Sequence, residues 1–132
     1  MRNPPLILLT DDEPNFRDVL EIKLKNAGYQ TITASNGEEG VKKAKELMPD
    51  LALMDVKMPK MDGLQALDVL RNDPATKNLK VVMLTAFGDP QSEIYETHKK
   101  FAKEIGATEY LLKSQDIDYI VSKVKDIISK LH

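Results

Sequence analysis

The chain has 132 residues, no cysteine and a formal net charge of −2, from 19 basic and 21 acidic side chains. This length predicts one domain, residues 1–132, that buries a core without disulfides. Balanced charge and an aromatic content of 5% argue against direct nucleic-acid binding. The first apolar run, residues 6–9, is too short for a signal peptide or a membrane span, so we expect a cytoplasmic protein without membrane contact.

Short apolar runs recur along the chain and predict its strands. Residues 6–9, 51–54, 81–84 and 110–112 are apolar at every position. Such continuous runs are typical of strands that are buried on both faces of a sheet. Residues 29–34 instead alternate between apolar and polar side chains, which predicts a strand at the edge.

Helical patterns with recognisable ends lie between these runs. The predicted helices cover about residues 14–27, 36–48, 89–105 and 116–131, and the third of the five opens at Asp62-Gly63 and carries Leu64, Leu67 and Leu70. Asn36 and Asp62 are expected to cap the second and third helices, and Gly28 follows the first helix where a C′ glycine belongs. In the fourth helix, Phe101 and its apolar neighbours are expected to face the core, with His98 as a packed or half-exposed histidine rather than a phosphate carrier.

Strands that alternate with helices predict an α/β fold, in which helices cover both faces of a parallel sheet. In such sheets, ligands bind outside the carboxyl ends of the strands. The residues just after each strand are therefore the candidates for function.

Polar side chains gather after four of the predicted strands. Asp11 and Asp12 follow the first strand, Asp55 the third, Thr85 the fourth and Lys113 the last. Two carboxylates ~5 Å apart repel by roughly 3 kcal/mol at an effective dielectric constant of ~20. Mg²⁺ relieves such repulsion well, because it prefers a few carboxylate or carbonyl oxygens and completes its shell with water.

This set of side chains suits phosphoryl transfer to Asp55. A carboxylate can attack phosphorus and become an acyl phosphate. Mg²⁺ and Lys113 would neutralise the phosphoryl oxygens, and the Thr85 hydroxyl would donate a hydrogen bond to one of them.

Four sequence segments carry a resemblance to a known family. They are LLTDDEP (8–14), LALMDVKMPKMDG (51–63), VVMLTAFG (81–88) and GATEYLLKS (106–114). Over essentially its full length, the chain resembles a bacterial response-regulator receiver domain of two-component signalling. The resemblance implies a flavodoxin-like doubly wound sheet of five parallel strands in the order 2-1-3-4-5, with five helices.

The resemblance also implies a role for each residue of the predicted site. Asp55 matches the phosphoacceptor, and Asp11 and Asp12 match the pair that holds Mg²⁺, Asp12 directly and Asp11 more often through water. The backbone carbonyl of Lys57 would complete the metal site. Lys113 matches the lysine that pairs with the phosphoryl group.

The family's output is implied in the same way. Thr85 matches the switch hydroxyl, and Tyr110 matches the aromatic residue that turns inward, changing the face made by the fourth helix, the last strand and the last helix. The phosphoryl donor would be a histidine kinase or a phosphotransfer protein. The domain would catalyse only its own phosphorylation and dephosphorylation.

The sequence departs from the family in three places. Ser114 replaces the usual proline after Lys113, so we expect a trans bond with a shifted loop or a strained cis bond. The stretch between Thr85 and the end of the fourth helix is longer than usual, which predicts a helix that begins earlier. Lys57 and Phe87 occupy variable positions that tune the lifetime of the phosphate in this family.

Two other functions of such a fold conflict with these residues. A phosphohydrolase of the haloacid-dehalogenase type needs a second acid where Lys57 stands, and a flavin binder needs a phosphate loop where Asp11 and Asp12 stand. A docking module that is never phosphorylated remains open because of Ser114. Phe16 is either a core residue or part of a docking surface.

Overall fold

The computed structural model describes residues 2–86 and 93–131 of the chain. Strands and helices alternate along it: β1 (Leu6–Thr10), α1 (Pro14–Asn26), β2 (Gln30–Ala34), α2 (Gly37–Leu47), β3 (Leu51–Asp55), α3 (Gly63–Arg71), β4 (Lys80–Thr85), α4 (Glu93–Ile105), β5 (Glu109–Leu112) and α5 (Ile117–Ser129). Every predicted strand and helix is therefore present.

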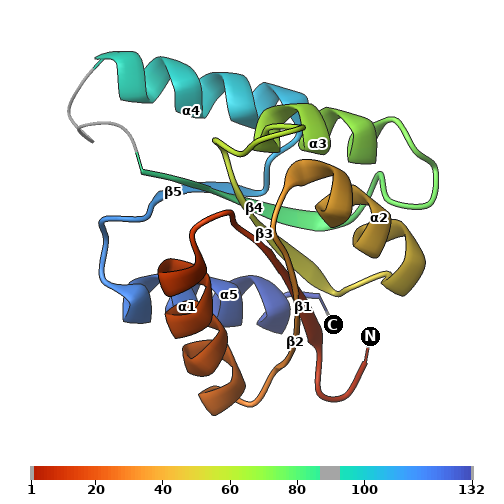
Figure 1. Ribbon diagram of the computed structural model, residues 1–132, viewed down its shortest axis with the longest axis vertical. Coiled ribbons are helices and arrows are strands. Elements are labelled where there is room, and N and C mark those ends of the chain that lie inside the picture. The colour runs from red at the N-terminus through yellow and green to blue at the C-terminus, as the bar shows by residue number, and fades with distance from the viewer. Residues whose placement is uncertain (1, 87–92, 132) are drawn as a thin grey trace.

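The strands form one parallel, five-stranded sheet in the order β2-β1-β3-β4-β5. Helices α1 and α5 cover one face, and α2, α3 and α4 cover the other (Figure 1). The expected α/β class, the strand order and the place of β2 at an edge are confirmed. Among the described residues, no helix is both long enough and apolar enough to cross a membrane.

Side chains of the central strands alternate between two buried clusters. Leu8, Met54 and Met83 pack under α2, α3 and α4. Their chain neighbours Leu9 and Leu53 pack under α1 and α5 on the other face. Because both faces are covered, β1 and β3 are buried at every position, which explains why their sequences are continuously apolar.

The predicted helix caps are confirmed. Asn36 accepts a hydrogen bond from the backbone nitrogen of Glu39 at 2.9 Å, and Asp62 forms a reciprocal capping box with Gln65. Gly28, with φ of 99°, follows α1 in the left-handed region. The carboxylate of Asp62 therefore serves as the N-cap of α3.

Helix α4 differs in part from its prediction. The expected start at Asp89 and Pro90 lies outside the described residues. The prediction that Phe101 faces the core is wrong, because its side chain is 53% exposed. Tyr95 and Ala102 take the face toward the sheet, and His98 is exposed.

Helix α3 begins in direct contact with the end of β3. The backbone nitrogen of Gly63 donates to the carbonyl oxygen of Val56 at 2.7 Å. A Cβ atom at Gly63 would lie 2.1 Å from the carbonyl oxygen of Asp55, much closer than any real contact. Only glycine allows this approach, which accounts for the Asp-Gly pair that opens the helix.

Candidate functional site

The carboxyl ends of the strands bring the predicted polar residues together. Asp55 is the last residue of β3, Thr85 is the last of β4, and Asp11 directly follows β1. All three are buried, with exposed fractions of 4%, 3% and 0%. Lys113 follows β5, where its backbone nitrogen donates to the carbonyl oxygen of Thr85 at 2.8 Å.

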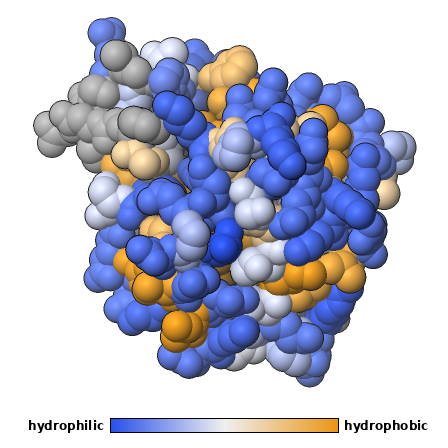
Figure 2. Space-filling view, viewed as in Figure 1, coloured by the Kyte–Doolittle hydropathy of each residue, from blue (hydrophilic) through white to orange (hydrophobic). Residues whose placement is uncertain are grey.

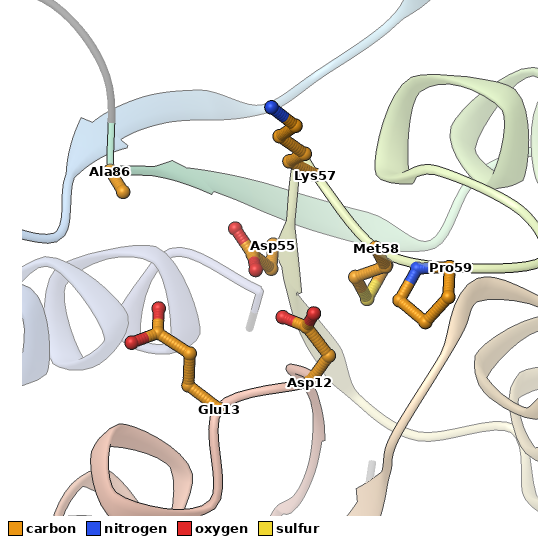
Figure 3. Close-up of a pocket in the computed structure, with 7 residues that line it drawn as sticks. All are labelled: Asp12, Glu13, Asp55, Lys57, Met58, Pro59 and Ala86. Carbon is orange, nitrogen blue, oxygen red and sulfur yellow. The ribbon is translucent and has the colours of Figure 1, made fainter.

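A pocket opens above these strand ends. Its lining residues come from the loops after β1, β3 and β4, and they are Asp12, Glu13, Asp55, Lys57, Met58, Pro59 and Ala86. The carboxylates of Asp12 and Asp55 lie in the centre of the pocket, and that of Glu13 faces them from the start of α1 (Figure 3). The side chain of Lys57 extends away from the acids, at the mouth of the pocket (Figure 3).

Lys113 carries the positive charge at the base of this site. Its Nζ lies 3.0 Å from Oδ2 of Asp11 and 3.6 Å from Oδ2 of Asp55. It also forms an ion pair with Glu13, and it lies 4.5 Å from the centre of the Phe16 ring. With only 6% of its side chain exposed, Lys113 depends on these groups for its solvation.

The buried acids resist ionisation. Burial raises the pKa of Asp55 to about 7, and the charge of Asp11 adds to this more than Lys113 offsets it. Burial also raises the pKa of Asp11. For Lys113 burial lowers the pKa, but Glu13, Asp11 and Asp55 together outweigh it and raise the pKa of the ammonium group.

The acids fit a hard divalent cation. One oxygen from each of Asp11, Asp12 and Asp55 lies within 4.8 Å of the others. Ligand oxygens of an octahedral Mg²⁺ lie roughly 3 Å apart when adjacent and roughly 4.2 Å apart when opposite, so the three carboxylates would draw together around a bound ion. Oδ2 of Asp11 is buried and receives no hydrogen bond from any described residue, although Lys113 approaches it. Its free lone pairs are what a cation or a bound water requires.

A second group of side chains lies beside the acids, between β4, β5 and α4. Tyr110 is 4% exposed, so its side chain points inward. Burial raises the pKa of its hydroxyl, and a hydrogen bond with Thr85 partly offsets that rise. The Tyr110 ring packs on Tyr95 of α4, with centroids 5.7 Å apart and planes tilted by 52°. Thr85 is thus connected to α4 through two rings.

The structure places the sequence-predicted residues in these two groups. Asp11, Asp12, Asp55 and Lys113 converge in the first, and Thr85 and Tyr110 form the second. Lys57 lies between the two groups. It lines the pocket of Asp12 and Asp55, and it also lines a second pocket with Thr85 and Tyr110. Phe87 lies outside the described residues.

The bond after Lys113 adopts one of the two expected forms. Among the described residues the only cis bond is Asn3–Pro4, so Lys113–Ser114 is trans. Lys113 still reaches both Asp11 and Asp55. The loss of the usual proline therefore does not remove the lysine from the site.

Sequence reasoning assigned no role to Glu13 or Tyr95 and left Phe16 undecided. Phe16 packs partly against the α1–α5 side of the core and under Lys113. Tyr95 could have been found, since it lies seven residues before Ala102 and so on the same buried face of α4. The Glu13–Lys113 contact spans 100 residues of sequence, and no local pattern indicates it.

Comparison with known families decides the identity. Residues 7–125 match the sequence model of the response regulator receiver domain. The chain belongs to this family. Receiver domains generally bind Mg²⁺ at an acidic pocket and interact with histidine kinases or phosphotransfer proteins in two-component systems.

Individual relatives agree with the assignment. Over 96% of its length, this receiver domain is 35% identical to the DNA-binding dual master transcriptional regulator RpaA of Synechocystis sp., of which it covers 50%. It is 32% identical over 93% of its length to protein PilH of Pseudomonas aeruginosa, of which it covers 97%. The chain spans about half the length of RpaA and of several other curated relatives that it matches.

A solved structure agrees as well. The signal receiver domain of a signal transduction histidine kinase from Syntrophus aciditrophicus superposes with a TM-score of 0.81 at 31% identity. The match covers 96% of this chain and 92% of that one. The receiver fold therefore extends over almost all of the chain.

Proposed function

We propose that this receiver accepts a phosphoryl group on Asp55 from a phosphohistidine of a histidine kinase or phosphotransfer protein. The observation that carries the proposal is the convergence of Asp55, Asp11, Asp12 and Lys113 at the carboxyl edge of the sheet. Burial of Asp55 at the end of β3 fixes the carboxylate in direction and limits access of water.

In the proposed step, an oxygen of the ionised Asp55 carboxylate attacks phosphorus. An O–P bond forms while the N–P bond of phosphohistidine breaks. The electron pair of that bond stays on the imidazole nitrogen, which leaves as neutral imidazole when its other nitrogen carries a proton. The product on this chain is an acyl phosphate.

The residues around Asp55 have distinct proposed roles. Asp11, Asp12, Asp55 and the backbone carbonyl of Lys57 would hold Mg²⁺. When bound, the ion supplies positive charge that stabilises the phosphoryl oxygens. Lys113, already 3.6 Å from Oδ2 of Asp55, would pair with the phosphoryl group.

The proposed output runs through Thr85 and Tyr110. A phosphoryl oxygen on Asp55 offers the Thr85 hydroxyl a charged acceptor in place of its bond with Tyr110. Because Tyr110 packs on Tyr95, a change at Thr85 would reach α4 and the α4–β5–α5 face. A downstream protein or an attached domain would read that face.

The lifetime of the phosphate would depend on Lys57, which lines the pocket, and on Phe87, two residues after Thr85 in the sequence. The domain would catalyse only its own phosphorylation and dephosphorylation. We propose no direct contact with nucleic acid, because the chain is weakly acidic overall.

Incubation with acetyl phosphate and Mg²⁺ tests the proposal. Mass spectrometry should detect one added phosphoryl group, which hydroxylamine removes and which Asp55→Asn abolishes. Asp68→Asn, on the exposed surface of α3, is the matched control and should be modified like the wild type. If the wild type gains no phosphoryl group at any Mg²⁺ concentration, a docking role without phosphorylation is favoured instead.

A further inference from the structure

Lys113 has one more anionic partner than the proposed chemistry needs. Besides Asp11 and Asp55, it pairs with Glu13, whose carboxylate lines the same pocket. The two side chains differ greatly in exposure, 6% for Lys113 and 59% for Glu13. Glu13 therefore reaches inward from the surface to contact a buried ammonium group.

Among residues 2–86 and 93–131, the Glu13 carboxylate has a hydrogen bond or ion pair with Lys113 alone. It occupies the N-cap position of α1, yet its carboxylate makes no capping hydrogen bond there. Glutamate is not among the preferred N-cap residues, whose short side chains reach the first free backbone nitrogens. Its backbone nitrogen instead donates to Oδ1 of Asp11 at 2.8 Å, which orients the residue toward the site. Such a departure from local preference is expected at functional positions.

Phe16 limits where the ammonium can move. Its ring centre lies 4.5 Å from Nζ of Lys113, one turn along α1 from Glu13. The ring face attracts the cation but offers no oxygen that could replace a carboxylate. Lys113 is thus held between Glu13, the ring and the two buried acids.

We propose that Glu13 is a positioning residue that holds Lys113 until a phosphoryl group on Asp55 displaces it. The inference rests on the proposed phosphorylation of Asp55. Phosphoryl oxygens and the Glu13 carboxylate compete for the same ammonium group, and the half-exposed Glu13 can turn into solvent when it is released. Glu13 therefore restrains phosphorylation, because the Glu13–Lys113 pair must separate for Lys113 to serve the phosphoryl group.

A double-mutant cycle with beryllofluoride, a stable mimic of the phosphoryl group, tests the exchange. Binding to the Mg²⁺-loaded protein is measured by ¹⁹F NMR in the wild type, Glu13→Gln, Lys113→Ala and the double variant. We expect Glu13→Gln to tighten binding about fivefold, the size of an ion pair with one exposed partner. In the Lys113→Ala background the same change should have no effect.

The cycle separates partner exchange from simple repulsion. If Glu13 only repelled the incoming anion, Glu13→Gln would tighten binding equally in both backgrounds, and that result overturns the proposal. Glu46→Gln, which removes an exposed acid of α2 far from the pocket, is the matched control and should leave binding unchanged. The rate of phosphorylation by acetyl phosphate should rise with the affinity in Glu13→Gln.

A direct readout makes the test independent of the Lys113 variants. With ¹³C-labelled glutamate, the carboxyl signal of Glu13, assigned from its loss in Glu13→Gln, should move to the position of a solvated glutamate when beryllofluoride binds. A signal that stays in place contradicts the exchange. If the wild type binds beryllofluoride but shows neither coupling nor movement, only this inference fails. If it neither binds beryllofluoride nor gains a phosphoryl group, the proposed function fails as well.

Discussion

The two groups of side chains at the carboxyl edge of the sheet differ in how their members interact: one is held against repulsion, and the other by attraction. The acidic group, Asp11, Asp12 and Asp55, holds like charges together, with one buried oxygen that lacks a hydrogen bond. The aromatic group, Tyr110 and Tyr95 with the Thr85 hydroxyl, is packed and hydrogen-bonded. The first is incomplete without a cation, whereas the second is complete as it stands.

This difference predicts opposite signs for the effect of substitution on stability. Removing a contact from the aromatic group should lower the free energy of unfolding, because a favourable packing contact or hydrogen bond is lost. Removing a charge from the acidic group increases stability, because repulsion is relieved. The acidic group is therefore suited to respond to ligands, and the aromatic group to transmit the response.

The largest effect is expected for Tyr95→Ala. Loss of a buried aromatic side chain costs about 3–5 kcal/mol, and Tyr95 is 8% exposed. Urea unfolding would measure the loss. Tyr119→Ala, at an aromatic residue of α5 that is 40% exposed, is the control and should cost far less. Similar costs for the two variants would mean that the Tyr95–Tyr110 contact is not a stabilising one.

The next effect, of opposite sign, concerns Asp55 in metal-free buffer. Its pKa is about 7 in the fold and 3.8 ordinarily, so between these values the native state holds more protons than the unfolded state. Stability should therefore fall as the pH rises from 4 to 7, by about 2–4 kcal/mol. The stability of Asp55→Asn should fall much less over this pH range, so the variant should be more stable than the wild type at pH 8.

Addition of Mg²⁺ provides the control for that prediction. The ion should restore stability to the wild type at pH 8 and do so less in Asp55→Asn, because one ligand charge is missing. Urea unfolding at pH 5 and pH 8, with EDTA or with Mg²⁺, covers the comparison. A wild type whose stability is flat across this range would contradict the strain assigned to the acidic group.

A smaller effect is expected for Tyr110→Phe, which keeps the ring and removes the hydroxyl. Loss of its bond with Thr85 should cost about 1 kcal/mol. Under the proposed output the variant should also bind beryllofluoride more tightly, because the Thr85 hydroxyl is no longer shared. Unchanged binding together with lowered stability would separate the Thr85–Tyr110 bond from the response to phosphorylation.

The smallest effect on stability is expected for Lys57→Ala, about 0.5 kcal/mol or less as a surface substitution. The consequence of Lys57→Ala and of Phe87→Ala should be a changed half-life of the acyl phosphate, followed by mass spectrometry after removal of the donor. Equal half-lives in the wild type and both variants would contradict the proposed tuning roles.

Much of the fold could be predicted from the sequence, because its signals are local. The continuous apolar runs, Asn36 and the Asp62–Gly63 pair each specify an element or its end without reference to distant residues. The ends of parallel strands then place Asp11, Asp55 and Lys113 at one edge of the sheet. The roles proposed for these residues and for Lys57 come from the resemblance to the family, and the experiments above test them.

What could not be predicted depends on packing. Phe101 has the right spacing for a core residue, but α4 is rotated so that Tyr95 and Ala102 fill the space over the sheet. Glu13 meets Lys113 only because the parallel sheet brings the segments after β1 and β5 to the same edge, 100 residues apart in the sequence. Periodicity shows which residues share a face of a helix, but not how far the helix is rotated about its axis when it packs on the sheet. It also cannot reveal such long-range pairs.

The close approach of Gly63 to the carbonyl oxygen of Asp55 constrains how the molecule can move. With α3 directly against the backbone of β3, the peptide that carries Asp55 has no room to shift toward that helix. A new group on the carboxylate would therefore act on neighbouring side chains such as Lys113 rather than by shifting the backbone of Asp55 toward α3. The absence of a Cβ atom at Gly63 thus limits the directions in which the protein can respond to a group on Asp55.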